Sequence, residues 1–524
     1  MALPGGADAR PNCRVEAAGL RIDWSRQFLD EHSRGVLLSL AAEAGFHEAR
    51  RKLFNGERVN ESEQRAAMHM ALRGAGERDW QVEGEVVSTQ VRAELERIEN
   101  FVAALRDDDR LGATGKPFRN VVNIGIGGSH LGPEVVTQAL PAAEGAPRVH
   151  FLSNVDPAQY HRVMDELDPE TTLLVVVSKT FTSRETMVNA RRAREWLVAA
   201  LGENAVADHF VAVSANVRRV NEFGIDETRL FRFWDWVGGR FSVWSAAGLA
   251  AAIHLGMPRF REMLAGAAAM DRHFLEAEDA VNAPLMLGLL DVQSIRAFGW
   301  SAWAVVPYSD RLRLLPAYLQ QLVMESNGKG ANQRGQMIEG QTGPVLLGGT
   351  GTDAQHAFFQ MLHQGPLPVP VDFIASACPQ GESTADWEGH RILLSNCLAQ
   401  AEALATGKSP EQVEAELRQQ GMDTDTIRRL VPQKSFKGNR PSTLVLMDRL
   451  SPVRLGALIA LYEHRVFVQA LLFGINPFDQ MGVELGKTLA GRMESVLADA
   501  DALAEDPIAE AAAQWIRSHW EPPS

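Results

Sequence analysis

Two patterns of hydrophobic and polar residues divide the chain. From about residue 28 to 98, charged and apolar residues recur at spacings of three and four, which predicts amphipathic helices. Beyond that point, short β-rich apolar runs alternate with longer amphipathic stretches. This alternation predicts βαβ crossovers and mainly parallel sheets that helices cover on both faces. The predicted strands are 120–126, 148–153, 172–177 and 209–214, then a second series at 302–307, 344–347, 369–375 and 443–447.

An Ala-rich helical region at 241–282 separates the two strand series and would bridge two α/β domains. Residues 400–430 are dense in Glu, Gln and Arg, which predicts a helical insertion on the surface, and residues 488–520 again show an amphipathic helical pattern. The predicted organisation is a helical N-terminal region (1–90), a first α/β domain (91–275), a second (276–475) and a C-terminal helical arm (476–524) that carries Lys487.

Charge and composition narrow the class of protein. The 524 residues carry 52 basic and 66 acidic side chains, a net charge of −14, which disfavours binding to nucleic acid or to an anionic membrane. No run reaches the roughly 18 uninterrupted apolar residues that a membrane helix needs, and the first 14 residues show no secretion signal. Three cysteines without metal-like or disulfide-framework spacing fit a reducing cytoplasm.

Two turns after predicted strands carry candidate anion-binding groups. Residues 121–132 read VVNIGIGGSHLG and lead through glycines into a helix, so backbone N–H groups can converge on an anion, although a tight turn without a ligand also fits. Residues 177–186 read VSKTFTSRET. Their five hydroxyls and two cations suit a phosphomonoester, whereas a helix cap would need only one hydroxyl. Neither a Walker lysine nor a dinucleotide pattern is present, which favours a sugar phosphate over a nucleotide.

Four charged or titratable residues stand at turns. Glu325 lies in the last turn of a helix that Asn-Gly ends, where the helix dipole favours a general base; from spacing alone, an exposed glutamate is the simpler interpretation. His356 follows a glycine turn, where histidines are more often structural, and Arg240 follows two glycines, where a helix-capping ion pair is as good an interpretation. Lys487 is one of eight lysines against 44 arginines, which suggests a role for its point charge or titratable amine; taken alone, a solvated surface lysine is the simpler interpretation.

Together these segments resemble the glucose-6-phosphate isomerase (phosphoglucose isomerase) family, in the family's order and spacing from about Val121 to Lys487. The most specific are DWVGGRFSVWSAAG (235–248) and FDQMGVELGK (478–487), and IGIGGS, SKTFTSRET, MESNGKG and GTDAQHAFFQMLHQG also match. The resemblance implies two sugar-isomerase (SIS) domains and an aldose–ketose isomerase of glycolysis and gluconeogenesis. Such an enzyme interconverts glucose 6-phosphate and fructose 6-phosphate by ring opening and a cis-enediol(ate), with no cofactor and no metal.

The resemblance also implies a role for particular residues. Glu325 would be the base that moves a proton between C2 and C1, and Arg240 would stabilise the enediolate. His356 would assist ring opening beside Lys487, and would reach the site from the neighbouring subunit of a homodimer. The implied substrate-binding residues are Gly128, Ser129, Ser178, Lys179, Thr180, Phe181, Thr182, Ser183, Gln321 and Gln480.

The chain departs from the family's pattern in places. It has Ser183 for Thr, Arg184 for Gln, Met481 for Trp, His130 for Asp, and Gly349-Thr350 for Glu-Pro before His356. Three other classes of protein fit the sequence less well. A sugar-phosphate sensor would need the hydroxyl-rich turn but not the four charged residues together. An amidotransferase would need a cysteine-led glutaminase domain, and a metal-dependent isomerase would need clustered His and Glu ligands.

Overall fold

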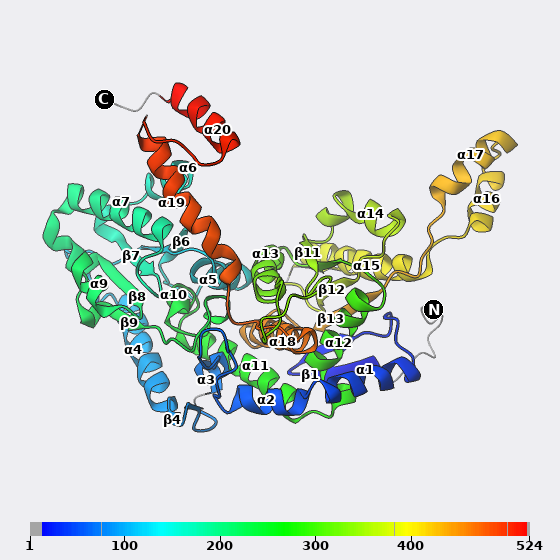
Figure 1. Ribbon diagram of the computed structural model, residues 1–524, viewed down its shortest axis with the longest axis horizontal. Coiled ribbons are helices and arrows are strands. Elements are labelled where there is room, and N and C mark those ends of the chain that lie inside the picture. The colour runs from blue at the N-terminus through cyan, green and yellow to red at the C-terminus, as the bar shows by residue number, and fades with distance from the viewer. Residues whose placement is uncertain (1–12, 75, 382, 500, 521–524) are drawn as a thin grey trace. The chain divides into compact units, whose positions relative to one another are not determined.

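The computed structural model describes residues 13–520 apart from 75, 382 and 500, as two compact units, Met1–Pro477 and Phe478–Ser524 (Figure 1). The first unit contains both sheets, and each unit is described by itself. All eight predicted strands are confirmed, with ends that differ from the prediction by at most two residues. The domain boundaries at 90 and 275 stay a prediction.

The first sheet has five strands, all parallel, because helices connect each strand to the next. Its strands are, in spatial order, β6 (Arg148–Leu152), β5 (Asn120–Ile124), β7 (Thr172–Val177), β8 (Phe210–Ser214) and β9 (Leu230–Arg232). The connecting helices are α5 (Gly128–Ala139), α6 (Pro157–Met164), α7 (Arg184–Leu201), α8 (Val206–His209) and α9 (Val217–Phe223). Every residue of β7 and β8 is buried, which explains their unbroken apolar runs. The three-residue β9 is too short to show such a run.

The second sheet is mixed. Its parallel strands are β13 (Ser442–Met447), β12 (Val371–Ser376), β10 (Ala302–Pro307) and β11 (Val345–Gly348). An N-terminal hairpin, β1 (Arg14–Ala17) and β2 (Leu20–Asp23), extends this sheet because β2 pairs antiparallel with β13. The hairpin lies within the predicted helical N-terminal region (1–90), ahead of the helical pattern that begins at about residue 28. Its strands have four residues each and carry charges at alternate positions, so they form no apolar run.

Helices supply the rest of the first unit. The N-terminal helices are α1 (Glu31–Glu43), α2 (Phe46–Phe54), α3 (His69–Gly74) and α4 (Ser88–Arg106), with a two-stranded ribbon of β3 (Gln81–Val82) and β4 (Glu85–Val86). The helices that follow the first sheet are α10 (Leu249–Leu255), α11 (Met257–Glu276) and α12 (Ala283–Arg296). Those of the second sheet are α13 (Leu315–Gln320), α14 (Phe359–Gln364), α15 (Thr384–Thr406), α16 (Pro410–Gln419), α17 (Thr424–Lys434) and α18 (Pro452–Phe473). The helical insertion is therefore confirmed.

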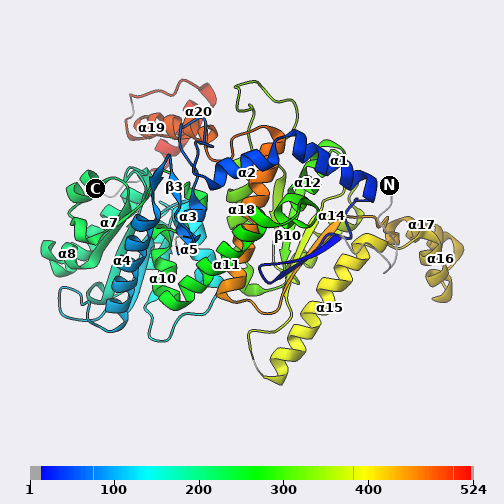
Figure 2. The ribbon, with the colours of Figure 1, turned by 90° about the horizontal axis from the view of Figure 1, so that it is seen from below.

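Helix α18 is a core helix of the first unit. It packs against α11 and α12, and Figure 2 shows the three side by side. Among the described residues it is the one helix long and apolar enough to cross a bilayer, but 89% of its most apolar window is buried inside the protein. It also carries the buried charged residues Glu463, His464 and Arg465. The helix is therefore part of the protein core.

A buried charge network fastens α3 to α11 and α18. The Arg73 guanidinium donates to Asp271 at 2.7 and 2.5 Å and to Glu463, and His464 Nε2 lies 2.6 Å from Asp271 Oδ1. Glu463 also accepts a hydrogen bond of 2.8 Å from the Trp244 indole. Burial by itself would raise the pKa of Asp271, but the Arg73 charge and these hydrogen bonds hold it below its usual value.

We expect Asp271→Asn to lower the free energy of unfolding by about 3 kcal/mol, because it removes a carboxylate charge from a buried arginine. The matched control is Glu99→Gln. Glu99 contacts Arg261 of the same helix α11 at 2.6 Å, but in an exposed pair that contributes at most about 1 kcal/mol. Urea unfolding of the two variants measures both values. Equal effects of the two substitutions would contradict the stabilising role of the buried network.

The second unit contains α19 (Glu484–Ala498) and α20 (Pro507–Ser518), so the helical character predicted for 488–520 is confirmed. The Arg517 guanidinium of α20 donates to the Val496 carbonyl of α19 at 2.6 Å. This contact helps to hold the two helices of the unit together.

Candidate active site

Two predicted anion-binding turns lie at one edge of the first sheet. The glycine turn (125–129) follows β5, and the hydroxyl loop (178–183) follows β7. These two strands are parallel neighbours, with Ile124 opposite Val176. The turns after them therefore meet at the carboxyl edge of the sheet, where ligands bind in α/β folds.

The glycine turn packs closely against the segment that carries Arg240, here called the arginine loop (235–242). A Cβ atom on Gly128 would come within 1.9 Å of the Gly239 carbonyl oxygen, so only glycine fits at that position. Gly127 has a φ of +62°, and a Cβ atom there would lie 3.1 Å from the Gln321 amide nitrogen. The glycines thus bring three separate segments of the chain together.

The hydroxyl loop directs several side-chain oxygens toward one another. Thr180 and Thr182 share a hydrogen bond of 2.6 Å between their hydroxyls, and Ser178 Oγ lies 3.5 Å from Ser183 Oγ. Phe181 stands between the threonines with a φ of +54°, and its ring is buried. The loop therefore offers hydroxyl donors at the start of α7, as a phosphate group requires.

Lys179 ties the hydroxyl loop to the arginine loop. Its ammonium donates to the carbonyls of Asp235 and Val237, at 2.9 and 3.2 Å. Burial lowers the pKa of Lys179. In this structure the lysine holds the two loops together, a role that its place in the motif does not reveal.

Arg240 is buried, at 2% exposure, and contacts with distant parts of the chain orient its guanidinium. Nε donates to Ser326 Oγ at 2.6 Å, an Nη group donates to the Pro477 carbonyl, and the other Nη lies 3.5 Å from Glu325 Oε1. Ser326 is a functional residue that sequence analysis misses. It stands in the MESNGKG segment, but its partner lies 86 residues away.

Glu325 ends a π-helical turn, Gln321–Glu325, that continues α13. Such turns are frequent at functional sites. The Gln321 amide donates to Glu325 Oε2 at 2.8 Å, and the glutamate side chain keeps 24% of its surface exposed. One carboxylate oxygen is thus held by an amide, and the other faces the Arg240 charge at an accessible position. This arrangement can accept a proton and stabilise a negative charge that develops beside it.

His356 lies in a short 3₁₀ turn, Asp353–His356, after β11. Two contacts with Tyr308 hold this turn in place: Gln355 donates to the Tyr308 hydroxyl at 2.8 Å, and Gly351 packs on the Tyr308 ring. The His356 side chain is exposed. Within the described part of the chain, no hydrogen bond or ion pair joins it to Glu325 or Arg240.

Gln480 and Lys487 belong to the second unit. Lys487 is exposed on α19, and its ammonium donates to Glu484 at 2.7 Å.

The predicted site residues of the first unit that the structure brings together are those of the glycine turn, the hydroxyl loop, the arginine loop and the π-helical turn. Among the described residues, no three His, Cys, Asp or Glu side chains form a group that could hold a metal ion.

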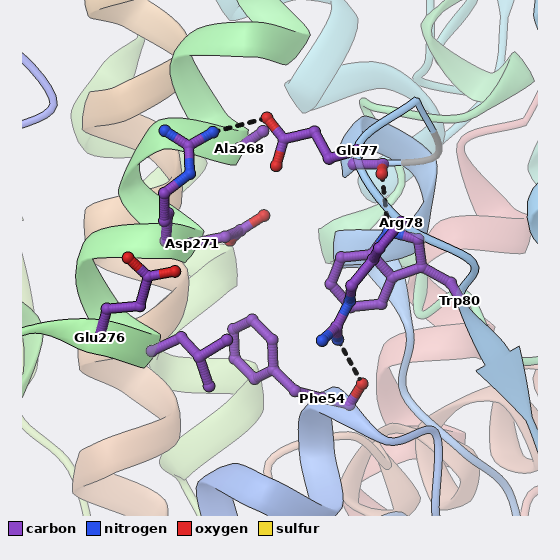
Figure 3. A pocket seen from close by; sticks show the side chains of 10 residues that line it. Phe54, Glu77, Arg78, Trp80, Ala268, Asp271 and Glu276 are labelled. Carbon is purple, nitrogen blue, oxygen red and sulfur yellow. Dashed lines mark hydrogen bonds and ion pairs between the residues drawn. The ribbon is translucent and has the colours of Figure 1, made fainter.

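A cavity of about 400 Å³ lies elsewhere, between α3 and α11, and none of the predicted site residues lines it. Figure 3 shows Asp271 at its wall, and Arg78 stacked on the Trp80 ring at 3.7 Å. Two hydrogen bonds close its rim, from Arg272 to Glu77 at 2.7 Å and from Arg78 to the Phe54 carbonyl at 2.7 Å. Four of its charged lining residues, Glu77, Arg78, Asp271 and Arg272, already form hydrogen bonds within the protein.

The two mainly parallel sheets and the helices that connect their strands confirm the predicted α/β fold. The sequence profile of the family "Phosphoglucose isomerase" matches residues 23–510. The chain is 47% identical over 494 residues to "Glucose-6-phosphate isomerase 1" of Thiobacillus denitrificans, covering 94% of this chain and 89% of that relative. It is also 47% identical to the "Glucose-6-phosphate isomerase" of a Chelativorans species, over 94% of this chain and 90% of the relative.

A solved structure extends the comparison to the fold. The crystal structure of a glucose-6-phosphate isomerase from Chlamydia trachomatis superposes with a TM-score of 0.84 at 32% identity, covering 99% of this chain and 96% of that one. The chain belongs to the phosphoglucose isomerase family.

Proposed function

We propose that the chain is a glucose-6-phosphate isomerase, which interconverts glucose 6-phosphate and fructose 6-phosphate. The observation that carries this proposal is the pairing of Glu325 with the buried Arg240, beside the glycine turn and the hydroxyl loop. A carboxylate base next to a fixed cation is what proton transfer through an enediolate needs. Membership of the family gives the substrates, because the relatives named above carry this activity in their names.

The proposed reaction uses the site in three steps. The hydroxyls of Ser178, Thr180 and Ser183 bind the substrate phosphate and orient the sugar without touching the reacting carbons. Glu325 then removes the proton from C2 of the opened aldose, and the electron pair left behind forms the enediolate that Arg240 stabilises. Return of the proton to C1, together with transfer of the hydroxyl proton from O2 to O1, gives the ketose. The remaining substrate contacts are assigned to Gly128, Ser129, Lys179, Phe181, Thr182, Gln321 and Gln480.

Ring opening is assigned to His356, with Lys487 beside it. In this proposal the protein is a cytoplasmic homodimer, and each active site takes His356 from the neighbouring subunit. Two features support the arrangement: His356 is exposed on its own chain, and the turn that carries it is held in place by the hydrogen bond from Gln355 to Tyr308. An exposed, fixed imidazole is suited to a site completed by a second copy of the chain.

One assay tests the proposed activity. Purified protein is given fructose 6-phosphate in the presence of EDTA, and glucose 6-phosphate formation is followed by a coupled dehydrogenase. Turnover in EDTA is the expected result. Loss of activity in EDTA with recovery on adding a divalent ion would contradict isomerisation without a metal.

Subunit mixing tests the shared site. In a dimer of Glu325→Ala and His356→Ala chains, one site carries both lesions and the other carries none. Random exchange makes about half of the dimers mixed, so activity should recover to roughly a quarter of the wild-type value. If His356 acts within its own chain, every site keeps one lesion and no activity returns after verified exchange. Mixing Glu325→Ala chains with Glu325→Gln chains is the matched control, which should recover nothing in either case.

A further inference from the structure

Trp244 joins the chain just after the arginine loop to the buried charge network of α3, α11 and α18. Its indole N–H donates to Glu463 Oε1 at 2.8 Å, and the Arg73 guanidinium lies over its ring, 4.7 Å from the centroid. All three side chains are buried. A hydrogen bond to a carboxyl group in such surroundings is strong and holds its donor in one direction. The network therefore fixes the chain four residues beyond Arg240.

Two further contacts hold the arginine loop from the core of the protein. The Phe241 ring stacks on His69 of α3, with centroids 4.7 Å apart and an angle of 24°. The Tyr318 hydroxyl donates to the Arg240 carbonyl at 3.3 Å. Tyr318 belongs to α13, which continues into the π-helical turn that ends at Glu325. This contact therefore joins the arginine loop to the element that carries the proposed base.

The backbone between Arg240 and Trp244 is a series of tight turns. The amides of Phe241, Ser242 and Ser245 each donate to the carbonyl three residues earlier, at 3.1, 3.2 and 2.9 Å. The Ser245 hydroxyl also donates to the Ser242 carbonyl at 2.7 Å. Few dihedral angles are therefore free to change between the two side chains. A displacement of the Trp244 ring should move the Arg240 backbone, and with it the guanidinium.

We propose that Trp244 and Tyr318 are positioning residues for Arg240, which keep its guanidinium where it stabilises the enediolate. This inference rests on the proposed function, which assigns that role to Arg240. Trp244 is 0% and Tyr318 1% exposed, so both act through the arginine and not on the substrate. Misplacing a catalytic group by about 1 Å can lower turnover about 10²-fold.

Trp244→Phe tests the first residue, because it removes the indole N–H and keeps a buried aromatic ring. We expect kcat for fructose 6-phosphate to fall at least about tenfold, while KM changes less than about threefold because the hydroxyl loop is untouched. The matched control is Trp303→Phe. Trp303 is also buried under a guanidinium, that of Arg465 at 3.9 Å, but its indole N–H has no hydrogen-bond partner among the described residues. This variant should keep the wild-type kcat.

Tyr318→Phe tests the second residue, and it decides alone if Trp244→Phe does not fold. It removes one hydroxyl, and we expect kcat to fall at least about threefold with little change in KM. Its matched control is Tyr160→Phe. The Tyr160 hydroxyl also donates to a backbone carbonyl, that of Arg192 at 3.1 Å, but on the outer helices α6 and α7. This control should turn over like the wild type.

A double-mutant comparison shows whether the effect passes through Arg240. In an Arg240→Lys background the cation is already misplaced, so adding Trp244→Phe should lower kcat less than about twofold further. Hydrogen–deuterium exchange of residues 235–248 measures the hold on the segment without any turnover. Its amides should exchange faster in Trp244→Phe than in the wild type or in Trp303→Phe.

Four results would overturn the proposal. They are a kcat within about twofold of wild type in both Trp244→Phe and Tyr318→Phe, an equal loss in Trp303→Phe, an undiminished loss in the Arg240→Lys background, and unchanged exchange of residues 235–248. Failure of the proposed function is a separate result, because the wild-type chain would then show no turnover. The exchange measurement would still decide whether Trp244 holds the segment.

Discussion

Glu325→Gln should lower kcat by about 10²–10⁴-fold, the usual effect of losing a general base. Glutamine keeps the size of the side chain and can still meet the Gln321 amide, which now holds Glu325 at 2.8 Å. It cannot take a proton from carbon at neutral pH. Because the lost interaction belongs to the chemical step, the KM for fructose 6-phosphate should change much less than kcat. Initial rates of the Glu325→Gln variant and the wild type in the coupled assay measure the effect.

The control for this prediction is Glu339→Gln, an identical change at an exposed glutamate 14 positions further along the chain. It should leave kcat at the wild-type value. A Glu325→Gln enzyme that keeps more than a tenth of wild-type turnover has lost no more than about 1.4 kcal/mol of transition-state stabilisation. That outcome would exclude Glu325 as the base.

The second large effect is expected for Arg240→Lys, which should reduce kcat by about 10²-fold or more even though the positive charge is kept. The guanidinium reaches Ser326, the Pro477 carbonyl and Glu325 at once, and an ammonium group cannot occupy all three directions. A misplaced cation stabilises the enediolate poorly. Substrate binding through the hydroxyl loop remains, so KM should again change much less than kcat.

Arg229→Lys is the matched control for Arg240→Lys. Arg229 also donates to a carbonyl and a carboxylate, both of Asp208, at 2.9 and 3.2 Å. It should show near wild-type turnover. Comparison of the two variants by kcat, KM and urea unfolding separates lost catalysis from lost stability. An Arg240→Lys enzyme within tenfold of wild-type kcat would contradict the role assigned to this side chain.

Strand positions could be predicted from the sequence because a strand buried on both faces leaves a continuous apolar run. Thr172–Val177 and Ala302–Pro307 match the prediction to the residue. The β1–β2 hairpin could not be predicted in this way, since its four-residue strands carry charges and owe their place to pairing with β13, more than 400 residues away. Long-range pairing of this kind has no local signal in the sequence.

The candidate residues could be found from their motifs, but their contacts could not. Glycines at 127 and 128 indicate a turn, whereas the need for glycine at 128 comes from Gly239, more than 100 residues later. Lys179 stands in a phosphate-binding pattern, yet its ammonium is engaged by the carbonyls of the arginine loop. Ser326 is one serine among many until Arg240 is placed against it. These contacts depend on tertiary packing and not on spacing.

The proton-transfer claim is tested most directly by isomerising fructose 6-phosphate in heavy water and following C2 of the glucose 6-phosphate product by NMR. If a carboxylate carries the proton between C1 and C2, part of it exchanges with solvent on Glu325 before it is returned. The product should then contain deuterium at C2 in a fraction of its molecules. Full turnover to product with no solvent deuterium at C2 would mean direct hydrogen transfer between the carbons, and would contradict a mechanism based on Glu325.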